Sequence, residues 1–306
     1  MRTLVTGGAG FVGTNLIKRL LKDGHEVISI DNYSTGKKEN EQRGCDYYDK
    51  DLSKTLWWAL WDTDQCEVTC DCQIEGVDLI FHLAALPRIA PSFEKPVDTF
   101  KSGPMTTINV LEWARHWETP VIYAGSSSVT GDVYANPYTF TKWQNEHLLE
   151  LYNKIYDLPV SICRFYNVYG EYQANEGSYC NVLGIFERQY KEGRQLTITG
   201  DGEQRRDFTY VGDIVDGLIK CGEAHLDVWG NKDVNGQSFE LGNGNNRSIN
   251  ELAQAFGETY PTKYIDARKG EMRETLNTDT KAQDILGWKP KGDIIKFIKE
   301  NYVFDK

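Results

Sequence analysis

The feature that most constrains how this 306-residue chain folds is a glycine-rich turn near its beginning. An apolar run starting at Leu4 leads into Thr-Gly-Gly-Ala-Gly-Phe-Val-Gly, which ends at Gly13, and apolar residues then recur at three- and four-residue spacing. This pattern predicts a strand, a tight turn and a helix with one buried face. In such a unit the glycines allow the turn, let backbone approach a pyrophosphate and let the helix pack against the strand, while the first helical N–H groups face the phosphates.

A second predicted strand supports a dinucleotide site at this turn. It covers residues 27–30 and is followed by Asp31, eighteen positions after Gly13, where an acidic residue accepts hydrogen bonds from an adenosine ribose. We expect the polar loop after this strand to wrap the same ribose through Asn32, Ser34, Thr35 and Gly36. Because no arginine stands beside Asp31 to accept a 2′-phosphate, the sequence favours NAD over NADP. The alternative is an ordinary βαβ unit that binds no ligand.

Strand and helix patterns alternate through the first half of the chain. Strands are predicted at residues 45–48, 77–85, 120–125 and 160–165, and helices at 56–61, 105–117 and 138–156. This alternation predicts an α/β fold with a Rossmann-type doubly wound parallel sheet. After residue 166 the elements become shorter and mixed, so we expect an NAD-binding domain over 1–166 and a smaller mixed α/β substrate domain over 167–306, with room for the chain to cross between the two.

Charge and hydropathy exclude several classes of partner. The net charge is −11 and the isoelectric point is near 5.0, which argues against nucleic acid and against an anionic membrane surface. No uninterrupted apolar run approaches the roughly 20 residues that cross a bilayer. Because a strand is already predicted at Leu4, there is no room for a signal peptide, and we expect a cytoplasmic protein. An anionic ligand must then be bound by individual arginines and helix N-termini.

The seven cysteines do not indicate a disulfide framework, because their number is odd and nothing in the sequence indicates secretion. Cys66, Cys70 and Cys72 lie close together in the sequence, with Cys45 available as a fourth thiol. Their spacing fits no common zinc-binding pair, so we expect reduced cysteines in a loop and no metal. A zinc site is the alternative.

Two side chains of the helix predicted at 138–156 form a candidate reactive pair. Tyr138 and Lys142 lie four positions apart, and therefore on one face. We expect that face to look towards Ser126 at the carboxyl end of a strand, the edge where parallel sheets bind ligands. A phenol with a pKa near 10 is a poor base at neutral pH, but a nearby ammonium group and the positive nicotinamide ring favour the phenolate. Ser126 can then pass a substrate proton towards Tyr138. The alternative is a solvated tyrosine–lysine pair on an exposed helix.

Over nearly its whole length the chain resembles the extended short-chain dehydrogenase/reductase family of nucleotide-sugar epimerases and dehydratases. The resemblance rests on the motifs above and on five further runs: Asp-Leu at 51–52, His-Leu-Ala-Ala at 82–85, Arg-Phe-Tyr-Asn-Val-Tyr-Gly at 164–170, Gly-Asp-Gly-Glu-Gln-Arg-Arg-Asp-Phe at 200–208, and Leu-Gly-Trp at 286–288. Members of the family are also homodimers formed through two long helices, so we expect a homodimer.

The resemblance implies roles for individual residues. For NAD it implies Gly7, Gly10, Phe11, Val12, Asp31, Asn32, Ser34, Thr35, Gly36, Asp51, Leu52, Leu83, Ala84, Ala85, Lys142 and Tyr166. For the nucleotide sugar it implies Ser126, Tyr138, Asn167, Asn181, Arg206, Arg268 and Glu271. A forked guanidinium suits a diphosphate, and a carboxylate suits a ribose diol. Ser126, Tyr138 and Lys142 are the implied catalytic residues.

The residues after Ser126 indicate which reaction of the family to expect. Related 4,6-dehydratases carry an Asp-Glu pair there and decarboxylases carry a Glu, whereas this chain has Ser127 and Ser128. Elimination then lacks its proton donor. The resemblance therefore implies an NAD-dependent 4-epimerase that acts on a UDP-hexose or a derivative through a transient 4-keto sugar. The alternatives are a net nucleotide-sugar oxidoreductase and a catalytically silent protein that binds NAD or a nucleotide.

The chain departs from the family pattern around the sugar. Tyr138 follows Ser126 by twelve positions, about half the usual separation, so much of a loop that walls the sugar is missing. Twelve residues still span well over about 30 Å, so the two side chains can meet. Thr130 replaces a family tyrosine, and Ser102 or Gly103 replaces an asparagine beside the nicotinamide.

Overall fold

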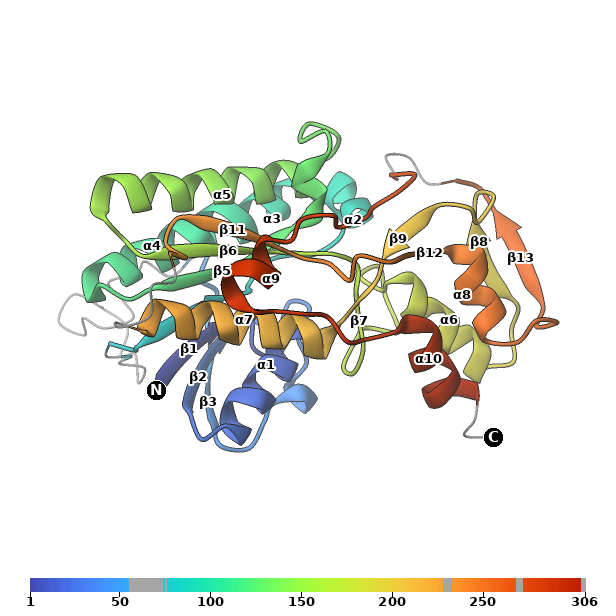
Figure 1. Cartoon of the computed structure of the whole chain (residues 1–306), viewed down its shortest axis with the longest axis horizontal. Helices are drawn as coiled ribbons and strands as arrows, with labels where there is room; N and C mark the ends of the chain where they lie inside the picture. The colour runs from blue at the N-terminus through green and yellow to red at the C-terminus, as the bar shows by residue number, and fades with distance from the viewer. Residues whose placement is uncertain (55–73, 75, 228–232, 268–271, 304–306) are drawn as a thin grey trace.

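The computed structural model describes residues 1–54, 74, 76–227, 233–267 and 272–303 (Figure 1). Within these residues a central sheet of seven parallel strands has the order β3-β2-β1-β4-β5-β6-β11. Its strands are β1 (Arg2–Thr6), β2 (Glu26–Asp31), β3 (Cys45–Asp49), β4 (Leu79–His82), β5 (Val121–Ser126), β6 (Val160–Phe165) and β11 (Gln237–Leu241). The strand order reverses between β1 and β4, and the crevice at the carboxyl ends of these strands is where such sheets bind ligands. The predicted Rossmann-type doubly wound sheet is confirmed.

Helices cover both faces of this sheet (Figure 1). One layer consists of α1 (Phe11–Lys22), α7 (Val211–Leu226) and α9 (Lys281–Leu286), and the other contains α4 (Thr106–Trp117) and α5 (Pro137–Tyr156). Successive residues of a strand pack on opposite faces of the sheet. Val5 lies in the core with α1 and α7, whereas Leu4 lies in the core with α4 and α5. Because both faces are covered, the central strands read as continuous apolar runs.

The smaller unit stands beside the carboxyl edge of the sheet and has a core of its own. Its helices are α6 (Val182–Lys191), α8 (Ile249–Ala255) and α10 (Ile294–Ile298). Three strand pairs accompany them: β8 (Leu196–Thr199) with β13 (Thr262–Ile265), β9 (Arg205–Asp207) with β12 (Asn246–Ser248), and β7 (Val168–Tyr169) with β10 (Thr209–Tyr210). Phe186 of α6, Leu252 of α8 and Ile298 of α10 are fully buried and belong to the same hydrophobic core.

The chain crosses between the sheet and the smaller unit more than once. After β6 it enters the smaller unit, returns to the sheet as α7 and β11, leaves again, and comes back as α9 before ending in α10. The segment 167–306 therefore supplies one strand and two helices of the sheet domain as well as the smaller unit. A cut between residues 166 and 167 does not separate the two.

Local sequence explains where the elements near the cavity begin and end. Asn136 caps α5 by accepting a hydrogen bond from the Thr139 N–H at 2.8 Å, and Pro137 fills the first helical position. The helix therefore begins one residue before the predicted range. The strand predicted at 77–85 covers only Leu79–His82, and Leu83, Ala84 and Ala85 after it line the cavity. Two short helices, α2 (Ile89–Glu94) and α3 (Pro96–Phe100), then lead to α4.

Some predictions fall on residues that the structure does not describe. The helix predicted at 56–61 and the cysteines Cys66, Cys70 and Cys72 lie outside the described residues. In the described part of the chain, no three His, Cys, Asp or Glu side chains gather in a way that suits a metal ion. The helices of that same part include none with the length and apolar character of a membrane span.

Candidate active site

A cavity of about 1050 Å³ runs from the glycine-rich turn along the carboxyl edge of the sheet and into the smaller unit. Most residues expected to bind NAD line it: Gly7, Gly10, Phe11, Val12, Asp31, Asn32, Ser34, Thr35, Asp51, Leu52, Leu83, Ala84, Ala85, Lys142 and Tyr166. It is also lined by Ser126, Tyr138, Asn167, Asn181 and Arg206. Gly36 is not a lining residue. It packs beneath the turn, where a Cβ would lie 2.9 Å from the Ala9 carbonyl carbon. Arg268 and Glu271 lie outside the described residues.

The turn between β1 and α1 leaves no space for side chains at its glycines. Gly7 has a φ of +75°, and a Cβ there would lie 2.9 Å from the backbone of Ala84. A Cβ at Gly13 would lie 2.2 Å from the Gly7 carbonyl oxygen, which would push α1 away from the turn. Gly10 precedes α1 without a capping side chain, so the first N–H groups of the helix remain for ligand oxygens. This cradle of bare backbone fits the pyrophosphate of a dinucleotide.

Asp31 stands at the end of β2, on the wall of the cavity, and is 8% exposed. Its two carboxylate oxygens accept hydrogen bonds from the N–H groups of Ala9 (2.9 Å) and Tyr33 (2.8 Å), which fix its orientation. Burial raises the pKa of Asp31, and these two hydrogen bonds oppose that rise. Each oxygen keeps a further lone pair, so the carboxylate suits the hydroxyl pair of an adenosine ribose.

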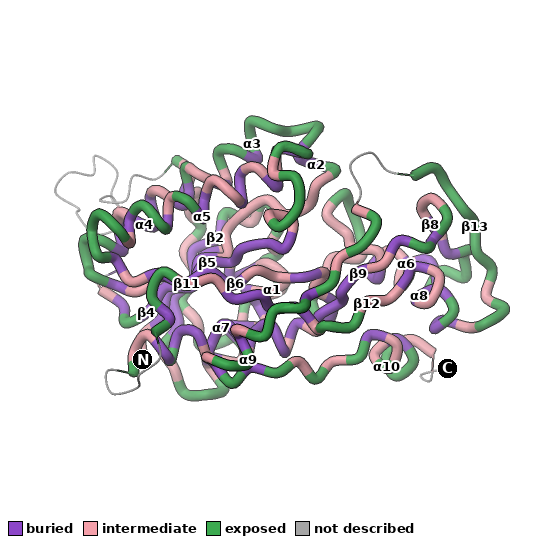
Figure 2. The backbone as a smooth tube through the Cα atoms, turned by 45° about the horizontal axis from the view of Figure 1, so that its top comes forward, coloured by how far each residue is buried: buried purple, intermediate pink, exposed green. Residues whose placement is uncertain are grey.

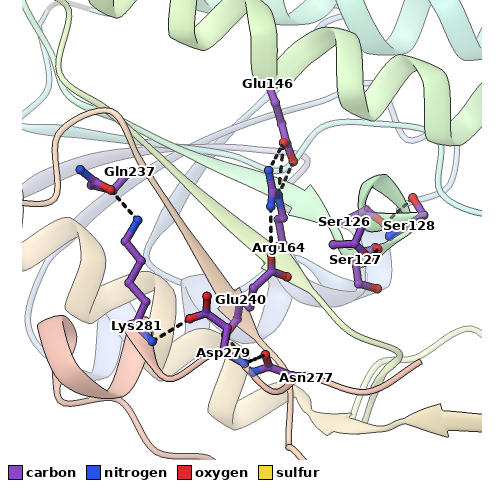
Figure 3. Close-up of polar contacts among 11 residues, drawn as sticks. Ser126, Ser127, Ser128, Glu146, Arg164, Gln237, Glu240, Asn277, Asp279 and Lys281 are labelled. Atoms are coloured by element: carbon purple, nitrogen blue, oxygen red, sulfur yellow. Dashed lines mark hydrogen bonds and ion pairs between the residues drawn. The ribbon is translucent and has the colours of Figure 1, made fainter. Parts of the chain in front are cut away.

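Ser126 and Tyr138 meet at the carboxyl end of β5. A side-chain hydrogen bond joins them, so the twelve-position separation is long enough to bring the two residues together. The Ser126 hydroxyl oxygen also lies 3.0 Å from that of Ser128 and accepts a hydrogen bond from the Ser128 N–H (Figure 3). These contacts hold the Ser126 hydroxyl at the cavity wall beside the phenol.

Lys142 lies one turn further along α5 and is 7% exposed. Its Nζ donates a hydrogen bond to the Ala124 carbonyl oxygen at 2.6 Å and lies 4.7 Å from the centre of the Tyr123 ring. Burial lowers the pKa of Lys142 to about 8, while the Glu146 carboxylate favours the charged form. The ammonium group therefore sits at the base of the cavity and keeps its charge at neutral pH.

The surroundings of Tyr138 act on its pKa in both directions. Burial raises the pKa of Tyr138, because the phenolate would lose water. The hydrogen bond with Ser126 and the positive charge of Arg88 oppose this rise. Arg88 lines the cavity, and its Nε donates to the Tyr179 carbonyl oxygen at 3.1 Å. No motif marks Arg88 in the sequence, so it was missed.

Behind Lys142 a partly buried arginine joins three elements. Arg164 of β6 binds the Glu146 carboxylate of α5 at 2.7 Å and the Glu240 carboxylate of β11 at 2.8 Å (Figure 3). Tyr166, at the cavity wall, forms a side-chain hydrogen bond with the same Glu240. The cluster ties the helix that carries the reactive pair to the sheet. Glu146 and Glu240 together balance the charges of Arg164 and Lys142.

The residues of the smaller unit that we expect to bind the substrate also form hydrogen bonds with backbone groups of that unit. The Asn167 side chain donates to the Asp207 carbonyl oxygen at 3.2 Å, and the Asn181 side chain caps α6. Arg206 is 9% exposed, and its guanidinium donates to the Arg205 carbonyl oxygen at 2.8 Å. A guanidinium held in this way suits an anionic group such as a diphosphate.

Fold and cavity together define a dinucleotide-binding protein built on a Rossmann-type sheet. The chain belongs to the NAD-dependent epimerase/dehydratase family, whose sequence profile matches residues 3–235. NAD is accordingly its cofactor, and the cradle at Gly7 and the carboxylate of Asp31 are the groups that fit it.

Known proteins resemble the chain over almost its full length. A UDP-glucose 4-epimerase of Mycolicibacterium smegmatis is 31% identical over 99% of this chain and 98% of its own. UDP-glucuronic acid decarboxylase 3 of Arabidopsis thaliana is 30% identical over 95% of this chain and 85% of its own. A crystal structure of UDP-glucuronic acid 4-epimerase from Bacillus cereus, in complex with UDP-glucuronic acid and NAD, superposes with a TM-score of 0.83 at 27% identity, over 99% of this chain and 98% of that one.

Proposed function

We propose that the chain is a nucleotide-sugar 4-epimerase that acts on a UDP-hexose or a derivative of one through a transient 4-keto sugar. The observation that carries this proposal is the cluster of Ser126, Tyr138 and Lys142 in the same cavity as the glycine-rich turn. Two of the similar proteins support the substrate class, since one is a UDP-glucose 4-epimerase and the other was crystallised with UDP-glucuronic acid and NAD.

In the proposed reaction Tyr138 is the base. Its phenolate takes the proton of the sugar 4-hydroxyl, the C4–H bond breaks, and C4 becomes a carbonyl carbon. The cradle at Gly7 and the Asp31 carboxylate would hold NAD, which would supply the acceptor for the C4 hydride and the donor for its return. Ser126 hydrogen-bonds the 4-oxygen and relays its proton, while Lys142 keeps a positive charge in the same cavity, at the Ala124 carbonyl oxygen. The 4-keto sugar then rotates in the site, so that the hydride returns to the other face of C4. Tyr138 gives the proton back to the 4-oxygen, and the product has the opposite configuration at C4.

We propose further that the substrate diphosphate is bound by Arg206 and Asn167, with Arg268 as a second phosphate ligand and Glu271 on the nucleoside ribose. Arg206 and Asn167 support this because both line the cavity from the smaller unit. Asn181, at the N-terminus of α6, lies along the same wall.

A UDP-glucuronic acid decarboxylase is the second candidate, because a relative of similar identity carries that name. The segment after β5 favours the epimerase. Ser128 points its hydroxyl at Ser126 in the position where the family resemblance implies a glutamate for decarboxylases. At neutral pH a serine hydroxyl cannot act as the general acid and general base that a carboxyl group can provide.

The test is incubation of the purified protein with a panel of UDP-, dTDP- and GDP-sugars, including UDP-glucuronic acid. Chromatography that resolves C4 epimers, with detection of NADH and of carbon dioxide, separates the candidates. We expect C4 epimers without accumulation of either by-product. Stoichiometric NADH would instead identify a net oxidoreductase, carbon dioxide a decarboxylase, and no product at all a silent binding protein.

We also propose that the chain forms a homodimer through α3 and α5. Val97 and Phe100 of α3 are 62% and 40% exposed, and Leu151 and Ile155 of α5 are 46% and 62% exposed. The two helices are in contact, and Figure 2 colours most of α3 as exposed. An apolar surface of this kind on two adjacent helices suits a symmetric interface with a second copy.

A further inference from the structure

The loop between β7 and α6 makes contacts that the proposed reaction does not use. It covers residues 170–181 and belongs to the smaller unit, in whose core both β7 and α6 take part. Most of its residues line the cavity, among them Tyr172 near its start and Tyr179 near its end. The loop is therefore a wall of the site, and how firmly it is held affects how easily a ligand leaves.

The first part of the loop is bound to the helix that follows the glycine-rich turn. The Asn15 side-chain amide of α1 donates hydrogen bonds to the Phe11 and Glu171 carbonyl oxygens, both at 2.9 Å. One turn further along α1, the Lys18 Nζ lies 5.8 Å from the centre of the Tyr172 ring. Phe11 is the first residue of α1 and lines the cavity. Glu171 is thus joined to the helical turn whose N–H groups fit the phosphates of the cofactor.

The backbone of the loop is fixed where it meets α1. Tyr172 has a φ of +64°, in the left-handed region that a tyrosine seldom adopts, so neighbouring contacts must hold it there. The Glu171 carboxylate accepts a hydrogen bond from the Tyr210 hydroxyl at 2.9 Å. Glu171 is therefore held to the smaller unit by its side chain and to α1 by its carbonyl oxygen.

The second part of the loop meets the opposite side of the crevice. The Tyr179 carbonyl oxygen accepts a hydrogen bond from the Arg88 Nε at 3.1 Å, and Arg88, with a φ of +86°, directly precedes α2. Ser92 of α2 accepts a hydrogen bond from the Tyr138 N–H of α5, which covers the face of the sheet opposite to α1. The loop therefore touches both helical layers and crosses the crevice at the carboxyl edge of the sheet.

The loop has a packed root in the smaller unit. The Gln173 side-chain oxygen accepts a hydrogen bond from the Asn181 amide at 3.0 Å. A Cβ at Gly184, in the first turn of α6, would lie 2.2 Å from the Ala174 carbonyl oxygen, so loop and helix are in close contact there. Because the contacts with α1 and Arg88 are polar contacts outside this root, they can break while the root stays in place.

We propose that residues 170–181 form a strap that closes the crevice over bound NAD, and that Asn15 is the residue that fastens the strap to α1. NAD then leaves only after the Asn15–Glu171 hydrogen bond has broken, and Arg88 holds the strap on the opposite side. A reaction that removes a hydride and returns it needs the same cofactor molecule in both steps, so retention of NAD suits the proposed function. The strap itself requires only that the chain binds NAD.

The test is the rate at which the holoprotein releases NAD. Protein that carries radiolabelled NAD is mixed with an excess of unlabelled NAD, and the label that stays on the protein is followed with time. Asn15→Leu keeps a helix-forming side chain of similar size but removes both donors, so we expect release about fivefold faster than from wild type, the effect of one net hydrogen bond. Arg19→Met changes an exposed ion pair on the same helix and should leave the rate unchanged.

Hydrogen–deuterium exchange shows whether the strap is what has changed. We expect the peptide over residues 170–181 to exchange faster in NAD-loaded Asn15→Leu than in loaded wild type, while peptides from the strands of the sheet exchange as before. Lys18→Met weakens the contact with Tyr172 from an exposed position and should quicken release by about twofold. This second variant keeps the proposal testable if Asn15→Leu does not fold.

The outcomes separate the strap from the proposed function. A wild-type rate of release in Asn15→Leu, or faster release without faster exchange of the loop, would overturn the strap; if Asn15→Leu does not fold, a wild-type rate in Lys18→Met would do so. Wild-type protein that forms no C4 epimer, while Asn15→Leu still releases NAD faster, would overturn the proposed function and leave the strap in place.

Discussion

At the scale of single residues, the cavity contains ionisable side chains whose charged forms are disfavoured by burial and favoured by neighbouring polar or charged groups. Tyr138 and Lys142 are both shifted towards their neutral forms by loss of water, and Ser126, Arg88 and Glu146 act against those shifts. The pKa of a buried phenol and that of a buried ammonium group both respond strongly to charges placed nearby. Residues one contact away from the reactive pair should therefore control the rate.

Asp31 permits a test of cofactor binding at this scale. Asp31→Asn keeps the shape of the side chain but removes the charge that faces the ribose, and a hydrogen bond to a charged group contributes about 1.5–3 kcal/mol. We expect NAD affinity, measured by calorimetry, to fall at least about tenfold. Asp49→Asn is the matched control, because Asp49 pairs with Asp31 across β2 and β3 but is 61% exposed and lies off the cavity. Equal NAD affinity in Asp31→Asn and wild type would contradict the assignment.

Residues within a motif could be predicted, whereas those recruited by the fold could not. The spacing of Tyr138 and Lys142 defined a shared helix face, and a strand-terminal Ser126 indicated the sheet edge, so these three were predicted together. Arg88 reaches the cavity through an unusual φ and through its hydrogen bond to the Tyr179 carbonyl oxygen, 91 positions away in the chain. Neither has a local sequence signal.

At the scale of elements, α5 positions the reactive pair and is itself held by the charge cluster behind it. Tyr138, Lys142 and Glu146 succeed one another at four-residue spacing, so the face that meets the cavity continues into the face that meets Arg164. Displacement of α5 from β6 would move the base and the ammonium together. The buried ion pairs therefore contribute to the geometry of the site as well as to stability.

The stability of this cluster can be measured. Arg164→Met leaves the Glu146 and Glu240 carboxylates buried without their cation, which costs about 3–5 kcal/mol when one partner of a buried pair is removed. We expect urea unfolding to show a loss of that size. Arg2→Met removes a partner of an exposed pair at 2.8 Å and should cost at most about 1 kcal/mol. Similar losses in the two variants would mean that the cluster is not energetically important.

At the scale of the whole molecule, the path of the chain is what sequence patterns failed to define. Periodicity and turn residues predicted β1 to β6 and the helices α1, α4 and α5 between them, but not the short helices α2 and α3. The sequence gives no local indication that residues 237–241 return to pair with β6, because their register depends on α7 first crossing back over the sheet. That return brings Glu240 under the cavity.

The homodimer is testable at this scale. Leu151→Glu combined with Ile155→Glu places two charges in the middle of the proposed interface, where an identical surface faces them. We expect sedimentation velocity to give twice the chain mass for wild-type protein and the single chain mass for the variant. Tyr264→Glu, which changes a 55% exposed aromatic residue in the smaller unit, should remain dimeric. A wild-type monomer would contradict the proposal.

The account depends most on Tyr138 as the base of a reversible oxidation at sugar C4. The measurement that tests this directly compares wild type with Tyr138→Phe in C4 epimer formation, with the NAD content of both proteins determined alongside. We predict that the variant loses at least about three orders of magnitude in kcat, within the range set by loss of a general base and its partners, while its NAD content is unchanged. Near wild-type epimerisation in Tyr138→Phe would contradict the account.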